Sequence, residues 1–282
     1  MSTIERIPAP AMARRRLARS GDDASRRLHG QVSVVIPCFN TVTTIESVLE
    51  TALRHTGGVV ADVLVIDNAS TDGTPELVEG LVRRHEAEGL RVTLLRNPTN
   101  LGYGGSIKRG FASLVVSSPY VAIMHADEQC DTAQTLLDLA DAFEHDPQPD
   151  VVLTSRFMRG AELSGYSPLR RVANRFFNAF TAAVCGVSMS DAGAAIMLAR
   201  SGAIASLPYE RMTSGYQFHP QLNLVLYSQP DLRITEVPME WRDAETQVRF
   251  NLVNYGLTLS RILLRFGWRR RVLRRSPIEA VA

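Results

Sequence analysis

The residues best suited to chemistry in this chain form a short polar stretch near its middle. The segment 125–129 holds four polar residues in five positions, among them His125, Asp127 and Gln129, and it directly follows the apolar run 120–124. Asp127 and Gln129 offer hard oxygen donors of the kind that Mg²⁺ or Mn²⁺ prefers. One carboxylate makes a poor metal cage by itself, but it is adequate where the phosphate groups of a substrate complete the coordination shell.

The elements that would position this stretch alternate between apolar runs and helical patterns. Short runs rich in Val, Ile and Leu predict strands at 32–36, 63–66, 92–95, 120–124 and 151–153. Between them, one helix is expected to begin near Thr43 and Glu46, which have capping-box spacing, and another at Thr74-Pro75. Strands without polar alternation, separated by helices, are typical of a mostly parallel sheet covered on both faces. We therefore expect an α/β fold with a Rossmann-like sheet.

Each predicted strand is followed by a loop that contains polar or glycine residues. In an open α/β sheet, ligands bind outside the carboxyl ends of the strands, so these residues are expected to share one edge. A single polar strand end is ordinary turn chemistry, whereas five together predict one polar crevice. The residues concerned are Asn40, Asp67, Asn68, Asn97, Asn100, Gly102, Gly104, Gly105, His125, Asp127, Glu128, Gln129, Ser155 and Arg156.

A glycine-rich segment, Leu101–Gly105, opens one of the predicted helices. Backbone N–H groups exposed at a helix start can hold an anion such as a phosphate. The segment lacks the spacing G-x-G-x-x-G of dinucleotide-binding loops, and the chain has no G-x-x-x-x-G-K-[ST] motif. A nicotinamide-dependent oxidoreductase and a P-loop protein are therefore disfavoured. Asp67, at the end of the second predicted strand, could accept hydrogen bonds from a ribose or a base.

Taken in order, four segments resemble the successive motifs of the family-2 glycosyltransferases, which have the GT-A fold. The segments are 32–40, 64–74, 100–105 and 124–129, with the sequences VSVVIPCFN, LVIDNASTDGT, NLGYGG and MHADEQ. The resemblance implies a nucleotide-diphosphate sugar as donor, an inverting transfer and Mg²⁺ or Mn²⁺ as cofactor. It also implies which residues bind the donor, namely Pro37, Asn40, Asp67, Asn68, Asn100, Gly102, Gly104, Gly105 and Ala126.

The motif His125-Ala-Asp127 departs from the family pattern, which has Asp-x-Asp at this place. The resemblance implies that Asp127 is a catalytic residue and the metal ligand, assisted by Gln129. His125 is a further candidate ligand, because a neutral imidazole can bind Mn²⁺ or donate to a phosphate, although it brings no negative charge. Alternatively, Glu128 could take over the role of the missing first carboxylate.

The second half of the chain resembles the branch of this family that acts on dolichyl or polyprenyl phosphates. The matching positions are Thr154–Phe157, similar to a Gly-Ser-Arg-Phe motif; Arg170, Asn174 and Asn178, spaced by four on one helical face; Asp191; and Glu236–Pro238 with Arg242. The resemblance is looser here than in the first half. Ala194–Met197 stands in place of Ser-Gly-Phe-Arg, and Gln247–Arg249 in place of Gly-x-Ser-Lys.

The branch resemblance implies a polyprenyl-phosphate acceptor. A phosphate is already a nucleophile and needs cations to hold it, which Arg156, Arg170, Arg171 and Arg242 could supply as catalytic groups. A soluble small-molecule or glycan hydroxyl is the alternative acceptor and would need a carboxylate base, for which Asp191 is the candidate, although it could equally cap a helix. A third hypothesis is a catalytically inactive nucleotide-sugar-binding scaffold, suggested by His125 and the lost Ser-Gly-Phe-Arg.

Charge and composition divide the chain into three parts. At 282 residues and 45% hydrophobic, the chain is long enough for one sizeable core. Residues 1–30 predict a basic flexible extension, 31–245 the GT-A domain, and 246–282 a C-terminal amphipathic helix with a basic tail, in which Leu252, Tyr255, Leu259, Ile262 and Phe266 recur at helical spacing. Such a helix suits peripheral contact with an anionic membrane surface, and the alternatives are packing on the domain or a homodimer interface.

Net charge and cysteine usage bear on partners and location. A net charge of +2 does not indicate a nucleic-acid binder. The three cysteines are widely spaced, which disfavours a disulfide framework or a zinc site and favours a reducing compartment. We find no apolar signal-peptide segment and no run of about 18 charge-free apolar residues. We therefore expect a cytoplasmic protein, located at the inner face of the membrane if it contacts one.

Overall fold

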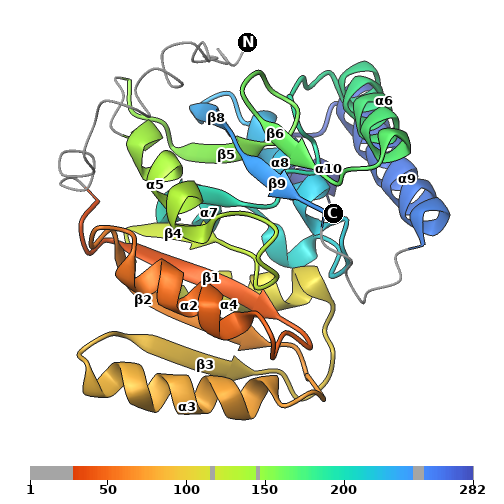
Figure 1. Cartoon of the computed structure of the whole chain (residues 1–282). Helices are drawn as coiled ribbons and strands as arrows, with labels where there is room; N and C mark the ends of the chain where they lie inside the picture. Colours follow the sequence, from red (N-terminus) through yellow and green to blue (C-terminus); the bar gives the residue numbers. More distant parts are fainter. Residues whose placement is uncertain (1–27, 115–117, 144–146, 244–250, 282) are drawn as a thin grey trace.

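The fold centres on a seven-stranded sheet whose neighbouring strands are often far apart in sequence (Figure 1). The computed structural model describes residues 28–114, 118–143, 147–243 and 251–281, so most of the predicted N-terminal extension and the segment Gln247–Arg249 lie outside the described residues. The strand order is β3-β2-β1-β4-β7-β5-β8. The strands are β1 Val32–Cys38, β2 Val60–Asp67, β3 Val92–Arg96, β4 Tyr120–Ile123, β5 Val151–Ser155, β7 Met197–Arg200 and β8 Ile234–Pro238.

Neighbouring strands of this sheet run parallel except at β7. β1 pairs parallel with β2 and β4, β2 with β3, and β5 with β8. β7 lies between β4 and β5 and is antiparallel to both. The carboxyl ends of the other strands therefore share one edge, and the residues that precede β7 reach that same edge. A second sheet pairs β6, Glu162–Ser164, with β9, Glu240–Arg242. The expected α/β fold with a mostly parallel sheet is confirmed.

Helices cover both faces of the sheet (Figure 1). Two hydrophobic cores, one on each face, hold these helices in place. Because side chains alternate along a strand, Val34 and Ile36 of β1 belong to one core and Val35 to the other. On the first face pack α2 Ile45–Arg54, α3 Thr74–Ala87 and α5 Thr132–Phe143. On the second pack α4 Tyr103–Leu114, α7 Ser201–Ala205, α8 Phe218–Tyr227 and α10 Pro277–Val281, with the short 3₁₀ helix Tyr209–Arg211 beside them.

The start of α2 corrects one expectation. The predicted capping box of Thr43 and Glu46 is wrong, because the N-cap is Thr44 and its side chain makes no capping hydrogen bond. The Thr44 hydroxyl instead donates to the carbonyl oxygen of Ala126 over 2.6 Å. This hydrogen bond ties the start of α2 to the loop after β4. The Thr44 side chain therefore helps to position the polar stretch and does not cap α2.

Two long helices, α6 Pro168–Cys185 and α9 Leu252–Arg271, lie side by side at one edge of the molecule (Figure 1). Leu259, Leu263 and Phe266 of α9 are buried. Gly267 allows close approach, because a Cβ there would lie 2.5 Å from the carbonyl oxygen of Val184 on α6. One side of the C-terminal helix therefore packs on the domain, as one of the predicted alternatives has it, while its other side is exposed.

No helix within the described ranges is both long and apolar enough to cross a membrane. All three cysteines are buried free thiols. Burial raises the pKa of Cys38 and of Cys130 to about 12.

Candidate active site

The loops after β1 and β2 are joined at the carboxyl edge of the sheet. The backbone N–H of Asn40 donates to the Ser70 hydroxyl, and the N–H of Thr71 donates to the Asn40 side-chain oxygen, both over 2.9 Å. Asp67 is buried at the end of β2 and accepts from the N–H of Ser70 over 3.3 Å. Asn40 has a φ of 54°, a left-handed conformation that a non-glycine residue holds only where its surroundings fix it. The structure thus brings Asn40 and Asp67 together in one rigid corner.

Three asparagines fix the segment that leads from β3 to α4. The side-chain amide of Asn97 donates to Asn68 Oδ1 and that of Asn68 to Asn100 Oδ1, each over 2.9 Å. The N–H of Leu101 also donates to Asn68 Oδ1 over 2.9 Å. Asn68 and Asn100 were both predicted to bind the donor. In the structure, these side-chain amide groups form hydrogen bonds within the loops instead.

The glycine-rich segment is shaped by packing rather than by an anion. The N–H of Gly102 donates to Asn100 Oδ1 over 2.8 Å, and that of Gly105 to the carbonyl oxygen of Ser214 over 3.1 Å. A Cβ on Gly104 would lie 2.6 Å from the Cβ of Phe218. The N–H groups of Gly102 and Gly105 are thus already bonded within the protein, which weakens the expectation that they hold a phosphate. The glycines allow the start of α4 to approach the loop before α8.

Two residues from other parts of the chain, Tyr103 and His219, extend the polar stretch after β4. The Tyr103 hydroxyl lies 3.2 Å from Nε2 of His125 and 3.1 Å from Nε2 of His219. Burial lowers the pKa of His125, and burial together with the nearby His125 lowers the pKa of His219 to about 3. Both shifts favour the neutral form of the imidazoles. Trp241 contacts the other side of His125, with ring centroids 5.6 Å apart and ring planes at 83°.

Asp127 fits a metal that is shared with a substrate, but not a metal held by protein alone. Its Oδ1 atom is buried and has no hydrogen-bond partner among the described residues, while Nδ1 of His125 lies 3.8 Å away. In the same part of the chain, no three His, Cys, Asp or Glu side chains gather into a metal-binding group. An orphaned carboxylate oxygen beside a polar crevice suits Mg²⁺ or Mn²⁺ only if phosphate oxygens supply most of the other ligands.

The other residues of the polar stretch have different surroundings. Gln129 is buried, and its carbonyl oxygen accepts from the N–H of Arg242 over 2.7 Å, which joins the stretch to β9. Ala126 is buried and bonded to Thr44, as described above. Glu128 is exposed and has a φ of 54°. The structure therefore brings Arg242 to the polar stretch through its backbone.

Arg156 and Asp191 form a bidentate ion pair. Nε of Arg156 donates to Oδ2 of Asp191 over 2.8 Å and Nη2 donates to Oδ1 over 2.9 Å, and the two side chains are only 14% and 1% exposed. Burial by itself would lower the pKa of Arg156, but the charge and hydrogen bonds of Asp191 outweigh it and raise that pKa above its ordinary value. Because both Asp191 oxygens accept from Arg156, Asp191 is not a free base in this arrangement. Oδ1 also accepts from the N–H of Gly193 over 3.0 Å, but residues 192–196 are not helical, so Asp191 caps no helix.

Aromatic rings connect this ion pair to the polar stretch. Cζ of Arg156 lies 5.4 Å from the ring centroid of Trp241 and 6.0 Å from that of Tyr166. Trp241 also contacts His125, so its indole stands between the ion pair and the His-Ala-Asp motif. The candidate site therefore extends continuously from the Asn40 corner, past Asp127, to Arg156.

The inner face of α6 closes the far end of the site. The Asn178 amide donates to the carbonyl oxygen of Ser190 over 2.6 Å, and Asn178 Oδ1 accepts from the N–H of Ala192 over 2.9 Å, so Asn178 holds both sides of Asp191. Asn174 donates to the Tyr166 hydroxyl over 2.8 Å. Arg170 pairs with Asp243 over 2.6 Å. The three residues predicted on one helical face thus all point toward the loops of the site.

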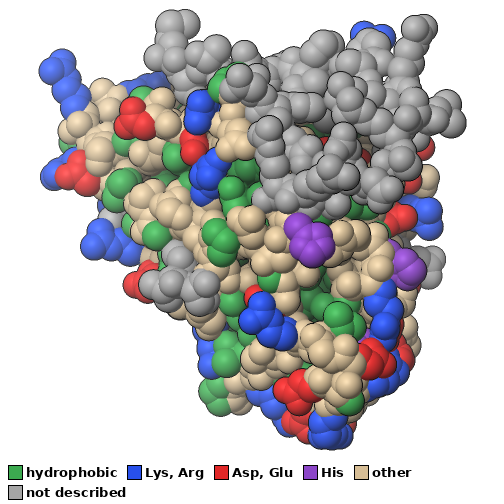
Figure 2. Space-filling model, turned by 90° about the vertical axis from the view of Figure 1, so that its left-hand side faces the viewer, with side chains coloured by type: hydrophobic (Ala, Val, Ile, Leu, Met, Phe, Trp, Pro, Cys, Tyr) green, Lys and Arg blue, Asp and Glu red, His purple; other side chains and the backbone are tan. Residues whose placement is uncertain are grey.

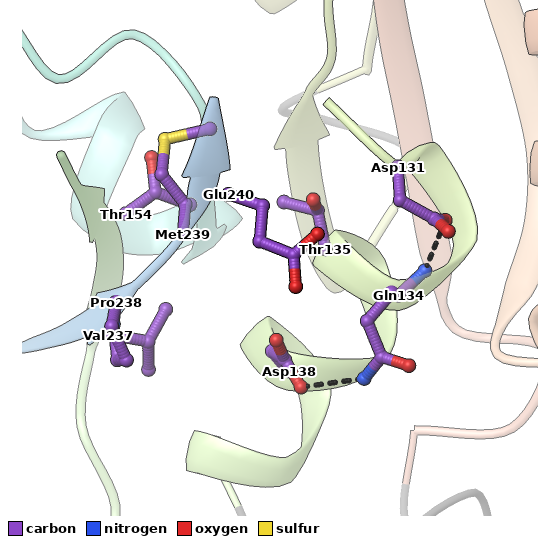
Figure 3. Close-up of a pocket in the computed structure, with 9 residues that line it drawn as sticks. All are labelled: Asp131, Gln134, Thr135, Asp138, Thr154, Val237, Pro238, Met239 and Glu240. Carbon is purple, nitrogen blue, oxygen red and sulfur yellow. Dashed lines mark hydrogen bonds between the residues drawn. The ribbon is translucent and has the colours of Figure 1, made fainter. Parts of the chain in front are cut away.

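A pocket of about 280 Å³ opens beside this site, between α5 and the β8–β9 segment (Figure 3). Its polar wall comes from Asp131, Gln134 and Asp138 of α5 and its entry loop, and Glu240 projects from the opposite side. Gln134 donates to Asp138 over 2.8 Å. None of the predicted catalytic, donor-binding or metal-binding residues lines this pocket, whose acidic wall would repel a diphosphate. This pocket therefore does not suit the diphosphate of a nucleotide.

Sequence reasoning missed Tyr103, His219, Tyr166 and Trp241. Tyr103 is part of the glycine-rich segment and Trp241 precedes Arg242, so both lay within matched motifs and could have been found there. His219 contacts the site through Tyr103 across 116 positions of sequence, and no local pattern marks it.

Comparison with known proteins identifies the family of this chain and its fold. The family model described as Glycosyl transferase family 2 matches residues 33–207, more than half of the chain. An undecaprenyl-phosphate mannosyltransferase of Micrococcus luteus is 26% identical over 218 residues, which cover 76% of this chain and 85% of that protein. A dolichyl-phosphate beta-glucosyltransferase of Dictyostelium discoideum is 27% identical over 103 residues, 34% of this chain and 30% of that protein.

Several curated relatives are matched over less than half of their length. The chain spans only 30% of the succinoglycan biosynthesis protein ExoA of Rhizobium meliloti and 47% of the glycosyltransferase AglJ of Haloferax volcanii. Among solved structures, a glucosyl-3-phosphoglycerate synthase from Mycobacterium tuberculosis, in complex with Mn²⁺, uridine-diphosphate and glucosyl-3-phosphoglycerate, superposes with a TM-score of 0.63. It is 19% identical, and the match covers 95% of this chain and 88% of that one, which shows a shared GT-A fold.

Proposed function

The chain belongs to glycosyl transferase family 2, and from this premise we propose that it transfers a sugar, with inversion, from a nucleotide-diphosphate sugar to a polyprenyl-phosphate-type lipid. We assign the transfer to residues 31–245 and a membrane contact to residues 246–282. The two-sided character of α6 carries the proposal: its inner face lines the candidate site, and its outer face is an exposed apolar stripe.

On the donor side, the rigid corner of Asn40 and Asp67 is the proposed nucleoside position. Asp67 is a buried carboxylate at a strand end, where its free lone pairs can accept from a base or a ribose hydroxyl. Pro37 and the glycine-rich segment form the adjoining walls. Asn68 and Asn100 support these walls through the asparagine bonds described above.

On the metal side, Asp127 would hold Mg²⁺ or Mn²⁺, with Gln129 nearby and the donor phosphates as the other ligands. The ion would supply positive charge that stabilises the nucleoside diphosphate as it leaves. Asp127 contributes the orphaned Oδ1, and the Thr44–Ala126 hydrogen bond holds the loop that carries it.

On the acceptor side, a phosphate would be held by arginines rather than activated by a base. Arg156 directs Nε and Nη2 to Asp191, which leaves Nη1 outside that fork. Arg170 and Arg242 stand at the ends of α6 and β9 that border the site. A hydroxyl acceptor needs a base, and the pairing of both Asp191 oxygens with Arg156 argues against that second candidate.

The outer side of α6 and α9 fits an acceptor with a buried lipid tail. We call it the α6–α9 surface. Its exposed apolar residues are Leu169, Val172 and Phe176 on α6 and Val253, Leu257, Leu264 and Trp268 on α9. Its exposed arginines are Arg171, Arg175, Arg261, Arg265 and Arg271, and neither helix contains Asp or Glu. Apolar side chains with interleaved cations suit the interface of an anionic bilayer. We place the protein at the cytoplasmic face of such a membrane.

The test is an assay of the purified chain with Mn²⁺, a panel of nucleotide sugars and three acceptors: a polyprenyl phosphate, the matching polyprenol and a soluble glycan. We expect release of nucleoside diphosphate with the lipid phosphate alone. Asp127→Asn removes the metal-binding charge and is expected to lower the rate by about 100-fold or more, since metal charge stabilisation contributes several kcal/mol. Asp138→Asn, a carboxylate of the neighbouring pocket, is the matched control and is expected to keep the rate.

Two outcomes would redirect the proposal. A metal-dependent product on the soluble glycan, with none on the lipid phosphate, would establish the hydroxyl acceptor instead. Nucleotide-sugar binding without turnover on any acceptor, equal in the wild type and in Asp127→Asn, would indicate an inactive binding scaffold.

A further inference from the structure

His219, Tyr103 and His125 form a chain of hydrogen bonds. The surroundings of the two imidazoles determine which group donates at each step of this chain. The Tyr103 hydroxyl lies within hydrogen-bond distance of one nitrogen from each imidazole, 3.1 Å from His219 and 3.2 Å from His125. A hydroxyl has a single proton, so it can donate to only one of the two nitrogens. A neutral imidazole likewise carries one N–H, on either Nδ1 or Nε2.

Nδ1 of His219, the nitrogen that does not face Tyr103, favours one direction of hydrogen bonding along this chain. In the part of the chain that the structure describes, Nδ1 of His219 is buried and has no hydrogen-bond partner. A proton on that atom would be a buried donor with nothing to accept it, and orphaned buried N–H groups are rarer in proteins than acceptors left without a partner. The proton therefore belongs on Nε2, from which His219 donates to the Tyr103 oxygen.

Nδ1 of His125, the nitrogen that does not face Tyr103, favours the same direction of hydrogen bonding. Its Nδ1 lies 3.8 Å from Oδ1 of Asp127. A lone pair on Nδ1 would face a carboxylate oxygen and be repelled, whereas an N–H there would be attracted. If His219 donates to Tyr103, the Tyr103 proton is free to be donated to Nε2 of His125, and the His125 proton is then on Nδ1.

From this agreement at both ends, we propose that His219 and Tyr103 are positioning residues that hold His125 in the tautomer with its proton on Nδ1. The first position of the His-Ala-Asp motif then presents a hydrogen-bond donor toward Asp127 and the donor diphosphate. Its Nε2 lone pair is used by Tyr103, so neither nitrogen offers a lone pair to a metal. This assignment sets aside His125 as a metal ligand.

Packing keeps the ring in the orientation that the proton order requires. The rings of Tyr103 and Trp241 meet that of His125 nearly edge-on, at 80° and 83°. Tyr103 is itself stacked on Tyr216, with centroids 5.8 Å apart. The consequence for the metal rests on the proposed function, but the tautomer does not.

The experiment is a ¹H–¹⁵N correlation spectrum of the full chain labelled with ¹⁵N in its histidine rings, without metal or nucleotide. Each ring shows directly which of its nitrogens carries the proton, and the variants His125→Asn and His219→Gln assign the two rings by loss of their signals. We expect the proton of His125 on Nδ1 and that of His219 on Nε2. The opposite order in either ring would overturn the proposal, whether or not the chain has transferase activity.

Two variants test the role of the tyrosine in the same spectra. Tyr103→Phe removes the hydroxyl, and His125 is then expected to populate both tautomers. Tyr120→Phe, at the opposite end of β4, is the matched control and should leave His125 on Nδ1. His219→Gln retains an N–H near the position of Nε2 and should also preserve the His125 tautomer. A His125 spectrum unchanged by Tyr103→Phe would contradict the positioning role.

A binding measurement addresses the metal. His125→Asn retains an N–H near the position of Nδ1, so its Mn²⁺ affinity in the presence of uridine diphosphate should stay within about threefold of the wild type, below the about tenfold that loss of a ligand or its support costs. A loss as large as that of Asp127→Asn would show that His125 is a ligand and would overturn the proposal. If the wild type binds no Mn²⁺ at all, the metal-dependent function fails, and the spectra alone decide the tautomer.

Discussion

At the scale of single residues, the Arg156–Asp191 pair has the largest expected effect on stability. Both charges are buried, and each is neutralised by the other. Removing one partner leaves an uncompensated charge, so Arg156→Met and Asp191→Asn are each expected to lower the free energy of unfolding by about 3–5 kcal/mol. Replacing both, as Arg156→Met with Asp191→Asn, should cost less than the sum of the single changes. Denaturant unfolding of the four proteins measures these differences.

An exposed ion pair provides the control for that prediction. Arg84 pairs at the surface with both Glu46 and Glu50, and the three side chains are 44%, 49% and 28% exposed. Arg84→Met is expected to change the free energy of unfolding by at most about 1 kcal/mol. Equal losses from Arg84→Met and Arg156→Met would contradict the view that burial gives the Arg156 pair its importance.

Sequence patterns locate individual site residues better than their partners. Asn40, Asp67 and Asp127 could be placed at one edge because each directly follows an apolar run. Arg156 and Asp191 could also be named, but as separate groups with separate roles, because their contact depends on the loop before an antiparallel strand. His219 could not be named at all. Its connection to His125 through Tyr103 exists only once α4 and α8 have packed together.

At the scale of elements, the crossing of α6 and α9 depends on Gly267. An alanine methyl there would meet the Val184 carbonyl oxygen at 2.5 Å, and overpacking of this kind costs about 1–3 kcal/mol. We expect Gly267→Ala to lower the melting temperature despite the better helix propensity of alanine. Gly80→Ala is the matched control, since a Cβ at the middle of α3 meets nothing within 4 Å. It should raise the stability by up to about 1 kcal/mol. Equal shifts for both variants would contradict a close helix crossing.

Strands β1 to β5 could be predicted from the sequence because parallel strands are buried on both faces and therefore appear as continuous apolar runs. Strands β7 and β8 were not predicted, and Met197–Arg200 contains no signal of the direction in which β7 pairs. The capping box failed for a different reason. The spacing of Thr43 and Glu46 was suitable, but the hydrogen bond from Thr44 to Ala126 is a tertiary contact that local spacing does not contain.

At the scale of the whole molecule, charged side chains are distributed unequally between faces. On the face seen in Figure 2, Lys and Arg are interspersed with Asp and Glu, and hydrophobic side chains are scattered. The α6–α9 surface instead combines arginines with apolar residues and has no acidic residue on either helix. Basic chain ends were evident from the sequence. The exposed stripe of α6 was not, because its apolar residues are equally consistent with a buried helix.

The α6–α9 surface should bind anionic vesicles. Arg261→Glu with Arg265→Glu is expected to reduce co-sedimentation with vesicles of phosphatidylglycerol and phosphatidylcholine by about tenfold or more, since each basic residue near such a surface contributes about 1 kcal/mol. Raised salt should weaken wild-type binding in the same way. Arg83→Glu with Arg91→Glu makes the same change in net charge on other exposed positions and should bind like the wild type.

A second copy of the chain is the competing occupant of this surface. If the wild type were a dimer in solution and failed to bind the vesicles, while Leu264→Ser with Trp268→Ser made it monomeric, the surface would be a subunit interface and the membrane contact would be wrong. Light scattering of the same variants gives the mass directly.

The two faces of α6 have a consequence for kinetics if the acceptor is a membrane lipid. A single helix then adjoins both the bilayer and the residues around Asp191, so the enzyme encounters acceptor within a plane rather than within a volume. Its rate would follow the mole fraction of acceptor in the bilayer and hardly change when more vesicles of the same composition are added. Diluting the acceptor with inert lipid would slow the reaction, although its amount per millilitre stays the same.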